Sequence, residues 1–184
     1  WSTISYDLVA HRVWGVGGWL RAMGALDFAG GTVVHINAGI SALVASLVLG
    51  PRNDFPHRSS PPHNVTLALL GGGMLWFGWF GFNAGSALSS GPLATVAFVS
   101  TNTAAASGML GWMLLEMFLK GKPTAVGAIT GAVAGLVAIT PACGFVTPLG
   151  AVTVGLGVSG VCYWALNQRM KWKLEDTLDA FSVH

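Results

Sequence analysis

Apolar residues along the chain form long, nearly uncharged runs that are separated by short polar segments. Five runs predict helices over residues 28–50, 64–88, 93–119, 124–140 and 145–166. About 20 apolar residues cross the hydrocarbon core of a bilayer, so these runs predict membrane spans, of which 124–140 is short. A last helix is expected to begin near Thr177. Residues 1–26 mix aromatic residues with glycine and arginine, which is typical of a membrane interface.

The polar segments between the runs predict the orientation of the helices. If successive helices alternate in direction, residues 51–63, 120–122 and 167–176 lie on one side of the membrane. These three loops hold seven lysine and arginine residues, whereas the other side has only Arg12 and Arg21. Because positively charged loops are retained in the cytoplasm, we expect the three loops to be cytoplasmic and the protein to be a multi-pass protein of the plasma membrane.

The composition agrees with a membrane protein. Of 184 residues, 53% are hydrophobic and only 9% are charged, against about 25% charged residues in a soluble domain. The 26 glycines and eight tryptophans are also typical of membrane helices. A net charge of +2 without a basic patch argues against a nucleic-acid partner. The predicted fold class is therefore an all-α polytopic transmembrane helix bundle.

Small residues indicate how these helices pack. Gly127, Gly131 and Gly135 recur at four-residue spacing on one helix face, and glycines 155, 157 and 160 form a less regular row. Such rows allow close backbone approach within a membrane. Both cysteines, at positions 143 and 162, lie in apolar stretches without a CxxC pair, so we expect buried packing residues and neither a disulfide nor a metal site.

A histidine inside an apolar run is the strongest candidate for function. His35 lies eight residues after Asp27, at about 12 Å depth for a rise of 1.5 Å per residue. Ionisable residues at that depth usually face a pathway, although a neutral histidine bonded to a neighbouring helix is the simpler alternative. His184 follows Asp179 in a similar way at the end of the chain. Two such segments of opposite direction are what an inverted repeat produces.

A pair of histidines in an apolar channel has a definite chemistry. Each neutral imidazole offers one donor and one acceptor nitrogen, so two rings together can hold a small polar molecule. Burial favours the neutral form of the ring. Such a pair would disfavour a hydrated cation and tolerate a neutral amine.

Aromatic residues gather in a second candidate region, residues 76–86. Trp79 and Phe82 are three positions apart and share a helix face. They are either a packing stripe or the lining of a channel mouth, where aromatic faces attract ammonium-like cations by about 0.5–2 kcal/mol. Ser86 could add a hydroxyl acceptor. Trp14 has the simpler alternative of a tryptophan in the interfacial belt.

Four segments resemble the ammonium transporter (Amt/Mep/Rh) family in order along the chain. They are DFAGGTVVHINAGISAL at 27–43, FGWFGFNAGSAL at 77–88, GAITGAVAGLVAITPACG at 127–144 and DAFSVH at 179–184. The resemblance implies part of an eleven-helix fold with an inverted repeat, assembled as a homotrimer. Residues 1–184 would be a partial domain from the end of the helix 4 region to the start of helix 10, truncated at both ends.

The resemblance also implies roles for single residues. His35 and His184 correspond to the twin-histidine pair, Trp14 and Ser86 to the external recruitment site for ammonium, and Phe82 to a ring of the gate. Trp79 and Thr140 correspond to residues of the pore or its wall, and Asp27 and Asp179 to structural or orienting acids. The implied function is recruitment of the cation, deprotonation, and passage past the histidines. It needs no cofactor, metal or enzymatic step, and a PII-type protein would regulate the full-length transporter.

Three other functions are weighed against transport. The same fold could serve as an ammonium sensor fused to a signalling module. A membrane redox protein could use His35 and His184 as haem ligands, but the aromatic mouth would then have no role. A purely structural helical scaffold would explain neither the buried histidines nor that mouth.

Overall fold

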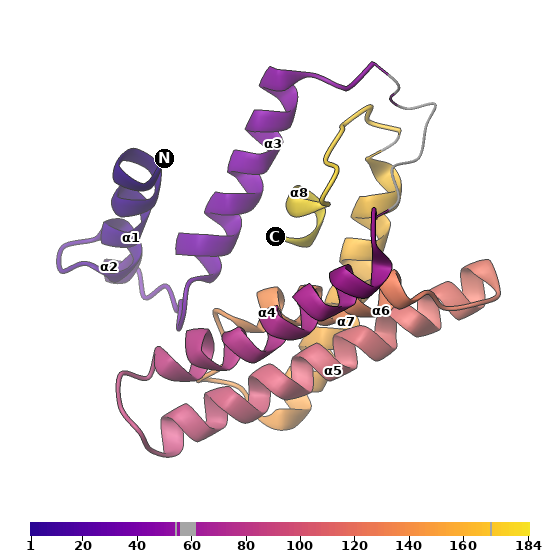
Figure 1. The fold of residues 1–184 in the computed structure, drawn as a ribbon. Coiled ribbons are helices and arrows are strands. Elements are labelled where there is room, and N and C mark those ends of the chain that lie inside the picture. The colour runs from indigo at the N-terminus through magenta and orange to yellow at the C-terminus, as the bar shows by residue number, and fades with distance from the viewer. Residues whose placement is uncertain (54, 56–61, 170) are drawn as a thin grey trace.

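The computed structural model describes residues 1–53, 55, 62–169 and 171–184, and every regular element within these ranges is helical (Figure 1). The elements are a π-helical turn η1 (Ser2–Tyr6) that continues into α1 (Asp7–Trp14), α2 (Trp19–Ala22), a second π-helical turn η2 (Gly31–Ile36) that continues into α3 (Asn37–Leu49), α4 (Val65–Gly85), α5 (Pro92–Lys120), α6 (Ala125–Ile139), α7 (Pro148–Gln168) and α8 (Ala180–Val183). The predicted all-helical class is confirmed for these residues.

The apolar runs of the sequence correspond to these helices. Within the described ranges, four helical segments are long and apolar enough to cross a membrane: Gly31–Leu49, α4, α5 and α7. The helix α6 is shorter, as predicted. Two predicted starts are wrong by about three residues, since α7 begins at Pro148 and α8 begins at Ala180. In both places a hydrogen-bonded turn precedes the helix. Most of the predicted loop 51–63 lies outside the described residues.

Polar side chains fix the starts of three helices. Asn64, Thr124 and Thr147 each accept a hydrogen bond from the backbone N–H three residues later, at 2.9–3.2 Å. These caps satisfy N–H groups that have no partner within the helix. At the other end of α5, Gly121 takes a left-handed conformation with φ of 82°, which glycine adopts without steric cost.

The helices form a bundle with one separate arm. The long α5 packs along α6 and α7, and α4 lies against α5 and α6. Figure 1 shows α3 standing apart from this bundle, with the short α8 between them. In agreement with that view, α8 contacts α3 on one side and α6 and α7 on the other. The final helix therefore joins the two halves of the structure.

Glycine lets α5, α6 and α7 approach backbone to backbone. A Cβ atom built on Gly135 would lie within 3.0 Å of the Ala104 carbonyl group in α5, and one on Gly155 would clash with the same carbonyl oxygen. The Ser159 hydroxyl donates to the Gly108 carbonyl oxygen at 2.7 Å and ties α7 to α5. The predicted close packing of the 127, 131 and 135 row is confirmed. The second row is only partly right, because a Cβ on Gly157 or Gly160 meets no atom of the described residues within 4 Å.

We expect the Gly135→Ala variant to unfold at lower temperature than the wild type. The added methyl group must push α5 and α6 apart, and overpacking of this kind costs about 1–3 kcal/mol. Thermal unfolding in detergent measures the loss. Gly157→Ala is the matched control, because its methyl group meets open space and alanine favours a helix. Equal unfolding temperatures for the two variants would contradict the close packing.

A buried glutamate, Glu116, joins the C-terminal end of α5 to the start of α6. The Glu116 carboxylate accepts hydrogen bonds from the Thr124 N–H at 2.7 Å and from the Thr124 hydroxyl at 2.9 Å. The Lys120 ammonium group lies 3.7 Å from this carboxylate and 5.2 Å from the centre of the Tyr163 ring. Glu116 therefore connects α5 to the start of α6, and Lys120 extends the contact to α7.

Candidate functional site

The site begins at a turn that is organised by Asp27. Its carboxylate accepts hydrogen bonds from four consecutive backbone N–H groups, those of residues 30–33, at 2.6–3.2 Å. Gly30 makes the turn possible with φ of 132°, a conformation that favours glycine. Asp27 thus caps this helix start more extensively than a single hydrogen bond would. The buried carboxylate is committed to the backbone and sets the start of the helix that carries His35.

This turn docks onto a second turn from the other half of the chain. The Phe28 N–H donates to the Pro141 carbonyl oxygen at 3.0 Å. A Cβ on Gly31 would clash with the Pro141 ring, and one on Gly144 would clash with the Phe28 ring. The contact between these turns fixes where η2 enters the structure relative to α6.

Trp14 is attached to the same turn. Its indole N–H donates to the Asp27 carbonyl oxygen at 2.8 Å, and the Arg21 guanidinium donates to the Trp14 carbonyl oxygen at 2.6 Å. The indole is therefore oriented by its N–H group, while 37% of the residue stays exposed. An interfacial tryptophan needs no such attachment, so the geometry favours a ring that is positioned by the Asp27 turn.

The C-terminal end of α4 lies at the same end of the site. A Cβ built on Gly30 would be 3.7 Å from the tip of the Phe82 ring. One turn later, the Ser86 hydroxyl donates to the Phe82 carbonyl oxygen at 2.7 Å. The hydroxyl proton is thereby used, and the Ser86 oxygen keeps its capacity to accept from a donor such as an N–H group.

The centre of the site is an aromatic cluster around His35. Its imidazole stacks on Trp79 with ring centres 5.3 Å apart, and it meets the edge of Phe82 at 5.9 Å. The imidazole of His184 lies 5.2 Å away, centre to centre. His35 is only 4% exposed, yet neither of its ring nitrogens has a hydrogen-bond partner among the described residues. Buried polar groups of that kind are rare in native structures.

Thr140 contributes to the site through Trp79. The Trp79 indole N–H donates to the Thr140 hydroxyl oxygen at 2.9 Å, and this hydroxyl donates to the Leu136 carbonyl oxygen at 2.7 Å. Thr140 is fully buried with an exposed fraction of 0%. It therefore lies behind the wall and holds the indole that stacks on His35.

Two cavities adjoin at His184. The first, of about 600 Å³, lies between α3, α4 and His184, and the second, of about 530 Å³, lies between α4, α6 and α8. Gly71, Leu75 and His184 line both. Along α4 the linings extend from Phe82 to Ala68, which is about 21 Å at 1.5 Å per residue. The other linings are mostly apolar: Val34, His35, Ala38, Met74, Gly78 and Trp79 in the first, and Gly72, Ile129, Thr130, Val133, Leu178, Asp179, Ala180 and Val183 in the second.

The segment before His184 is held by charged residues. Asp179 takes a left-handed conformation with φ of 55° and forms an ion pair with Arg169. Burial raises the pKa of Asp179 to about 6, although the Arg169 guanidinium opposes this effect. A different acid caps α8: the Asp176 carboxylate accepts a hydrogen bond from the Phe181 N–H at 2.7 Å.

Sequence reasoning found Asp179 and missed its two partners, Arg169 and Asp176. Both lie in or beside the charged segment 167–176, whose polarity indicates only a loop. No sequence signal distinguishes them from exposed charges nearby. The other acid of this segment, Glu175, binds Arg52 in the segment after α3, and the Arg52 backbone N–H lowers the pKa of this carboxyl.

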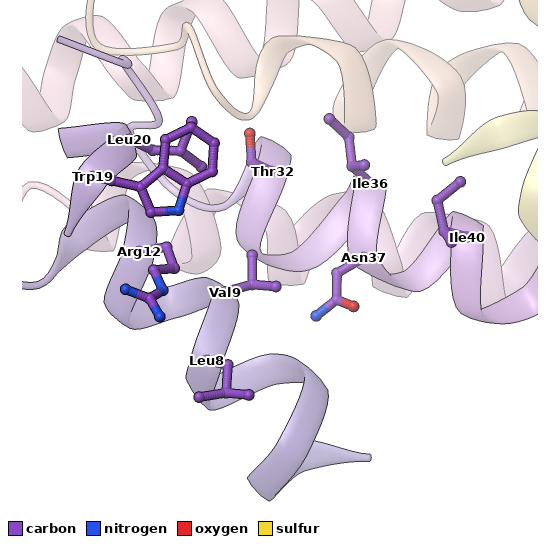
Figure 2. Close-up of a pocket in the computed structure, with 9 residues that line it drawn as sticks. All are labelled: Leu8, Val9, Arg12, Trp19, Leu20, Thr32, Ile36, Asn37 and Ile40. Carbon is purple, nitrogen blue, oxygen red and sulfur yellow. The ribbon is translucent and has the colours of Figure 1, made fainter. Parts of the chain in front are cut away.

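A third cavity lies apart from the two histidines. It is an almost wholly apolar groove of about 370 Å³ between α1, α2 and the η2–α3 helix. Figure 2 shows Leu8 and Val9 on one side of it, Ile36 and Ile40 on the other, and the Arg12 side chain beside them. This groove is lined by neither His35 nor His184, so we place the candidate site in the first two cavities.

Comparison with known protein families gives one match over the whole chain. The Ammonium Transporter Family matches residues 1–184. The ammonium transporter of Bacillus subtilis is 52% identical over 100% of this chain and 45% of its own length. The transporter Amt1 of Archaeoglobus fulgidus is 50% identical over 100% of this chain and 46% of its own length. The chain therefore spans less than half the length of these curated relatives.

Solved structures of similar proteins share the fold. Mep2 of Candida albicans superposes with a TM-score of 0.93 at 42% identity, covering 100% of this chain and 42% of Mep2. A protein described as a sensor Amt protein superposes with a TM-score of 0.90 at 37% identity, covering 98% of this chain and 48% of its own. Both similarities therefore extend over all or nearly all of this chain.

Proposed function

The chain belongs to the ammonium transporter family, and from this premise we propose that it forms a central part of a pore that carries ammonium or ammonia across a membrane. The family comprises transporters rather than enzymes, and its members are polytopic membrane helix bundles like this one. Within such a transporter, residues 1–184 would extend from the end of the helix 4 region to the start of helix 10.

The observation that carries the proposal is the unpartnered imidazole of His35. Both of its nitrogens are buried, lack a partner among the described residues, and belong to a residue that lines a cavity together with His184. An imidazole pair offers both donors and acceptors to a neutral molecule that has both, as ammonia does. A cation gains nothing comparable from apolar walls, and its transfer into them is costly.

The mouth of the site has the complementary chemistry for a cation. The Trp14 ring, fixed by its bond to the Asp27 turn, and the acceptor oxygen of Ser86 suit an ammonium ion. Phe82 lies one turn inside Ser86 and touches His35 edge to face, so its ring separates the mouth from the histidines. We propose that ammonium is recruited at the mouth, releases its proton before the apolar segment, and passes His35 and His184 as ammonia.

The wider assembly follows from the family and from charge. We propose a homotrimer in the plasma membrane, with residues 51–63, 120–122 and 167–176 on the cytoplasmic side, where basic loops are retained. A PII-type protein is the proposed regulator of the full-length transporter. The haem-protein and scaffold alternatives give no role to the positioned mouth and are set aside.

A sensor is the second candidate function. It rests on the similarity to the sensor Amt protein, which shares the fold at 37% identity. A sensor needs ammonium to bind at the mouth and the histidines, but it needs no flux through them.

We expect the Trp14→Ala variant to raise the half-saturating ammonium concentration of transport about 2- to 30-fold, which corresponds to the 0.5–2 kcal/mol of a cation–π contact. The measurement is the ammonium-induced current and methylammonium uptake of a full-length transporter carrying this sequence, in proteoliposomes. Trp19→Ala is the control, since Trp19 is exposed and lines the separate apolar groove.

The result separates the two functions. Uptake by the wild type, with a higher half-saturating concentration in Trp14→Ala only, supports transport. Ammonium binding without current or uptake would assign the site to a sensor. An unchanged half-saturating concentration in Trp14→Ala would remove Trp14 from the recruitment site.

A further inference from the structure

Arg169, the residue that follows the C-terminal end of α7, closes the turn that leads to α8. Its guanidinium forms an ion pair with the Asp179 carboxylate and donates a hydrogen bond to the Asp176 carbonyl oxygen. Its own carbonyl oxygen accepts the Leu174 N–H at 2.9 Å. One residue thus connects the end of one helix with three points of the following turn.

The turn determines where the last helix begins. The Asp176 carboxylate accepts the Phe181 N–H, and the Asp176 carbonyl oxygen accepts the Asp179 N–H at 3.0 Å in addition to the Arg169 guanidinium. The next helical bond joins the Asp179 carbonyl oxygen to the Val183 N–H at 3.0 Å. These bonds connect the turn directly to the first residues of α8 (Ala180–Val183).

His184 directly follows Val183 of α8, where space is limited. A Cβ built on Gly39 of α3 would be 3.1 Å from the backbone of His184, so α8 and α3 touch closely. The His184 imidazole faces His35 with ring centres 5.2 Å apart. A change in the turn therefore moves one imidazole relative to the other.

Arg169 also neutralises an acid in the wall of the second cavity. Asp179 lines this cavity together with His184, and Arg169 is the cation paired with it. Both side chains are 23% exposed, so the pair is shielded from bulk water. Without Arg169, an unpaired carboxylate would lie at the inner end of the pathway and could hold a cation there.

We propose that Arg169 is a positioning residue of the pore, which sets the place of His184 against His35 by holding the Asp176–Asp179 turn and neutralising Asp179. The proposal rests on the proposed transport function, because it assigns to Arg169 an effect on passage past the histidines. It predicts an effect on the maximal flux and none on recruitment at the distant mouth.

The test compares Arg169→Ala with the wild type in a full-length transporter carrying this sequence. In proteoliposomes we expect the maximal ammonium flux per inserted molecule to fall at least fivefold, with the half-saturating concentration unchanged. Lys171→Ala is the matched control, since Lys171 is an exposed cation in the same turn, and it should keep the wild-type flux. The conservative variant Arg169→Lys, which keeps a cationic donor for the Asp179 carboxylate and the Asp176 carbonyl oxygen, should retain at least half of the flux that Arg169→Ala loses.

The outcomes distinguish positioning from a merely structural role. A lower unfolding temperature with unchanged flux per molecule would overturn the proposal, as would equal losses in Arg169→Ala and Lys171→Ala. An experimental structure of Arg169→Ala should show the two imidazoles displaced from their wild-type separation, and an unmoved His184 would also overturn it. This last measurement holds even if the wild type proves to be a sensor, so failure of the transport function is recognised separately.

Discussion

Replacing His35 by alanine is expected to lower the ammonium flux of the full-length transporter at least about tenfold. Among the described residues of η2 and α3, three line the cavity of about 600 Å³, namely Val34, His35 and Ala38, and His35 is the polar one. Its removal leaves His184 as the one imidazole among aromatic and aliphatic lining residues of this cavity. A lost hydrogen bond in a buried site costs about 1–3 kcal/mol, and each 1.4 kcal/mol added to a barrier slows passage tenfold.

The measurement is methylammonium uptake together with current recorded on a solid-supported membrane. His35→Gln should lose less than His35→Ala, because glutamine keeps both donor and acceptor groups. His63→Ala is the matched control, since His63 is exposed and lies just before α4, away from the cavity. Wild-type flux in His35→Ala would exclude His35 from the pathway, and an equal loss in His63→Ala would show that the effect is not specific to the pore.

Replacing Asp27 by alanine is expected to destabilise the protein by at least about 3 kcal/mol and to reduce the yield of folded transporter strongly. The substitution leaves four backbone N–H groups without their acceptor, and each buried donor without a partner costs about 1–3 kcal/mol. The turn also carries the Trp14 indole bond and the contact with Pro141, so the mouth should lose its order together with the helix start.

Thermal unfolding in detergent and the yield of monodisperse protein measure this loss. Asp27→Asn should be intermediate, because asparagine keeps one acceptor oxygen in place of two. Asp7→Ala is the control, since Asp7 is an exposed acid in the first turn of α1. A stable Asp27→Ala protein, with an unfolding temperature like that of Asp7→Ala, would contradict the central role of this turn.

Local features of the site could be predicted because they depend on neighbours in the chain. The Asp27 cap joins residues only three to six positions apart, and the shared face of Trp79 and Phe82 follows from helical periodicity. The depth of His35 follows from the length of the apolar run. The start of α7 was misplaced because apolar residues continue into the turn before it, and that of α8 because no sequence pattern indicates the left-handed conformation of Asp179.

Contacts between distant segments could not be predicted from single residues. The family resemblance implies only that Thr140 lies near the pore. The packing of α6 on α4 shows that its hydroxyl oxygen accepts a hydrogen bond from the Trp79 indole N–H. The sequence indicates only that Arg169 and Asp176 are charged loop residues. The structure of the turn before α8 shows that Arg169 pairs with Asp179 and that Asp176 accepts the Phe181 N–H. Nor does the spacing of glycines 155, 157 and 160 tell which of them faces a neighbouring helix.

The sequence by itself determined the class of this protein, because hydrophobic runs of membrane length and scarce charge leave no stable structure outside a bilayer. It also determined the helices, since these depend on interactions within a few residues. The resemblance paired His35 with His184, which are 149 residues apart in the chain, but only the tertiary structure decided that their ring centres lie 5.2 Å apart. Their meeting depends on how α8 is held between α3 and the bundle, and this packing arises from many weak contacts between distant segments rather than from any local pattern.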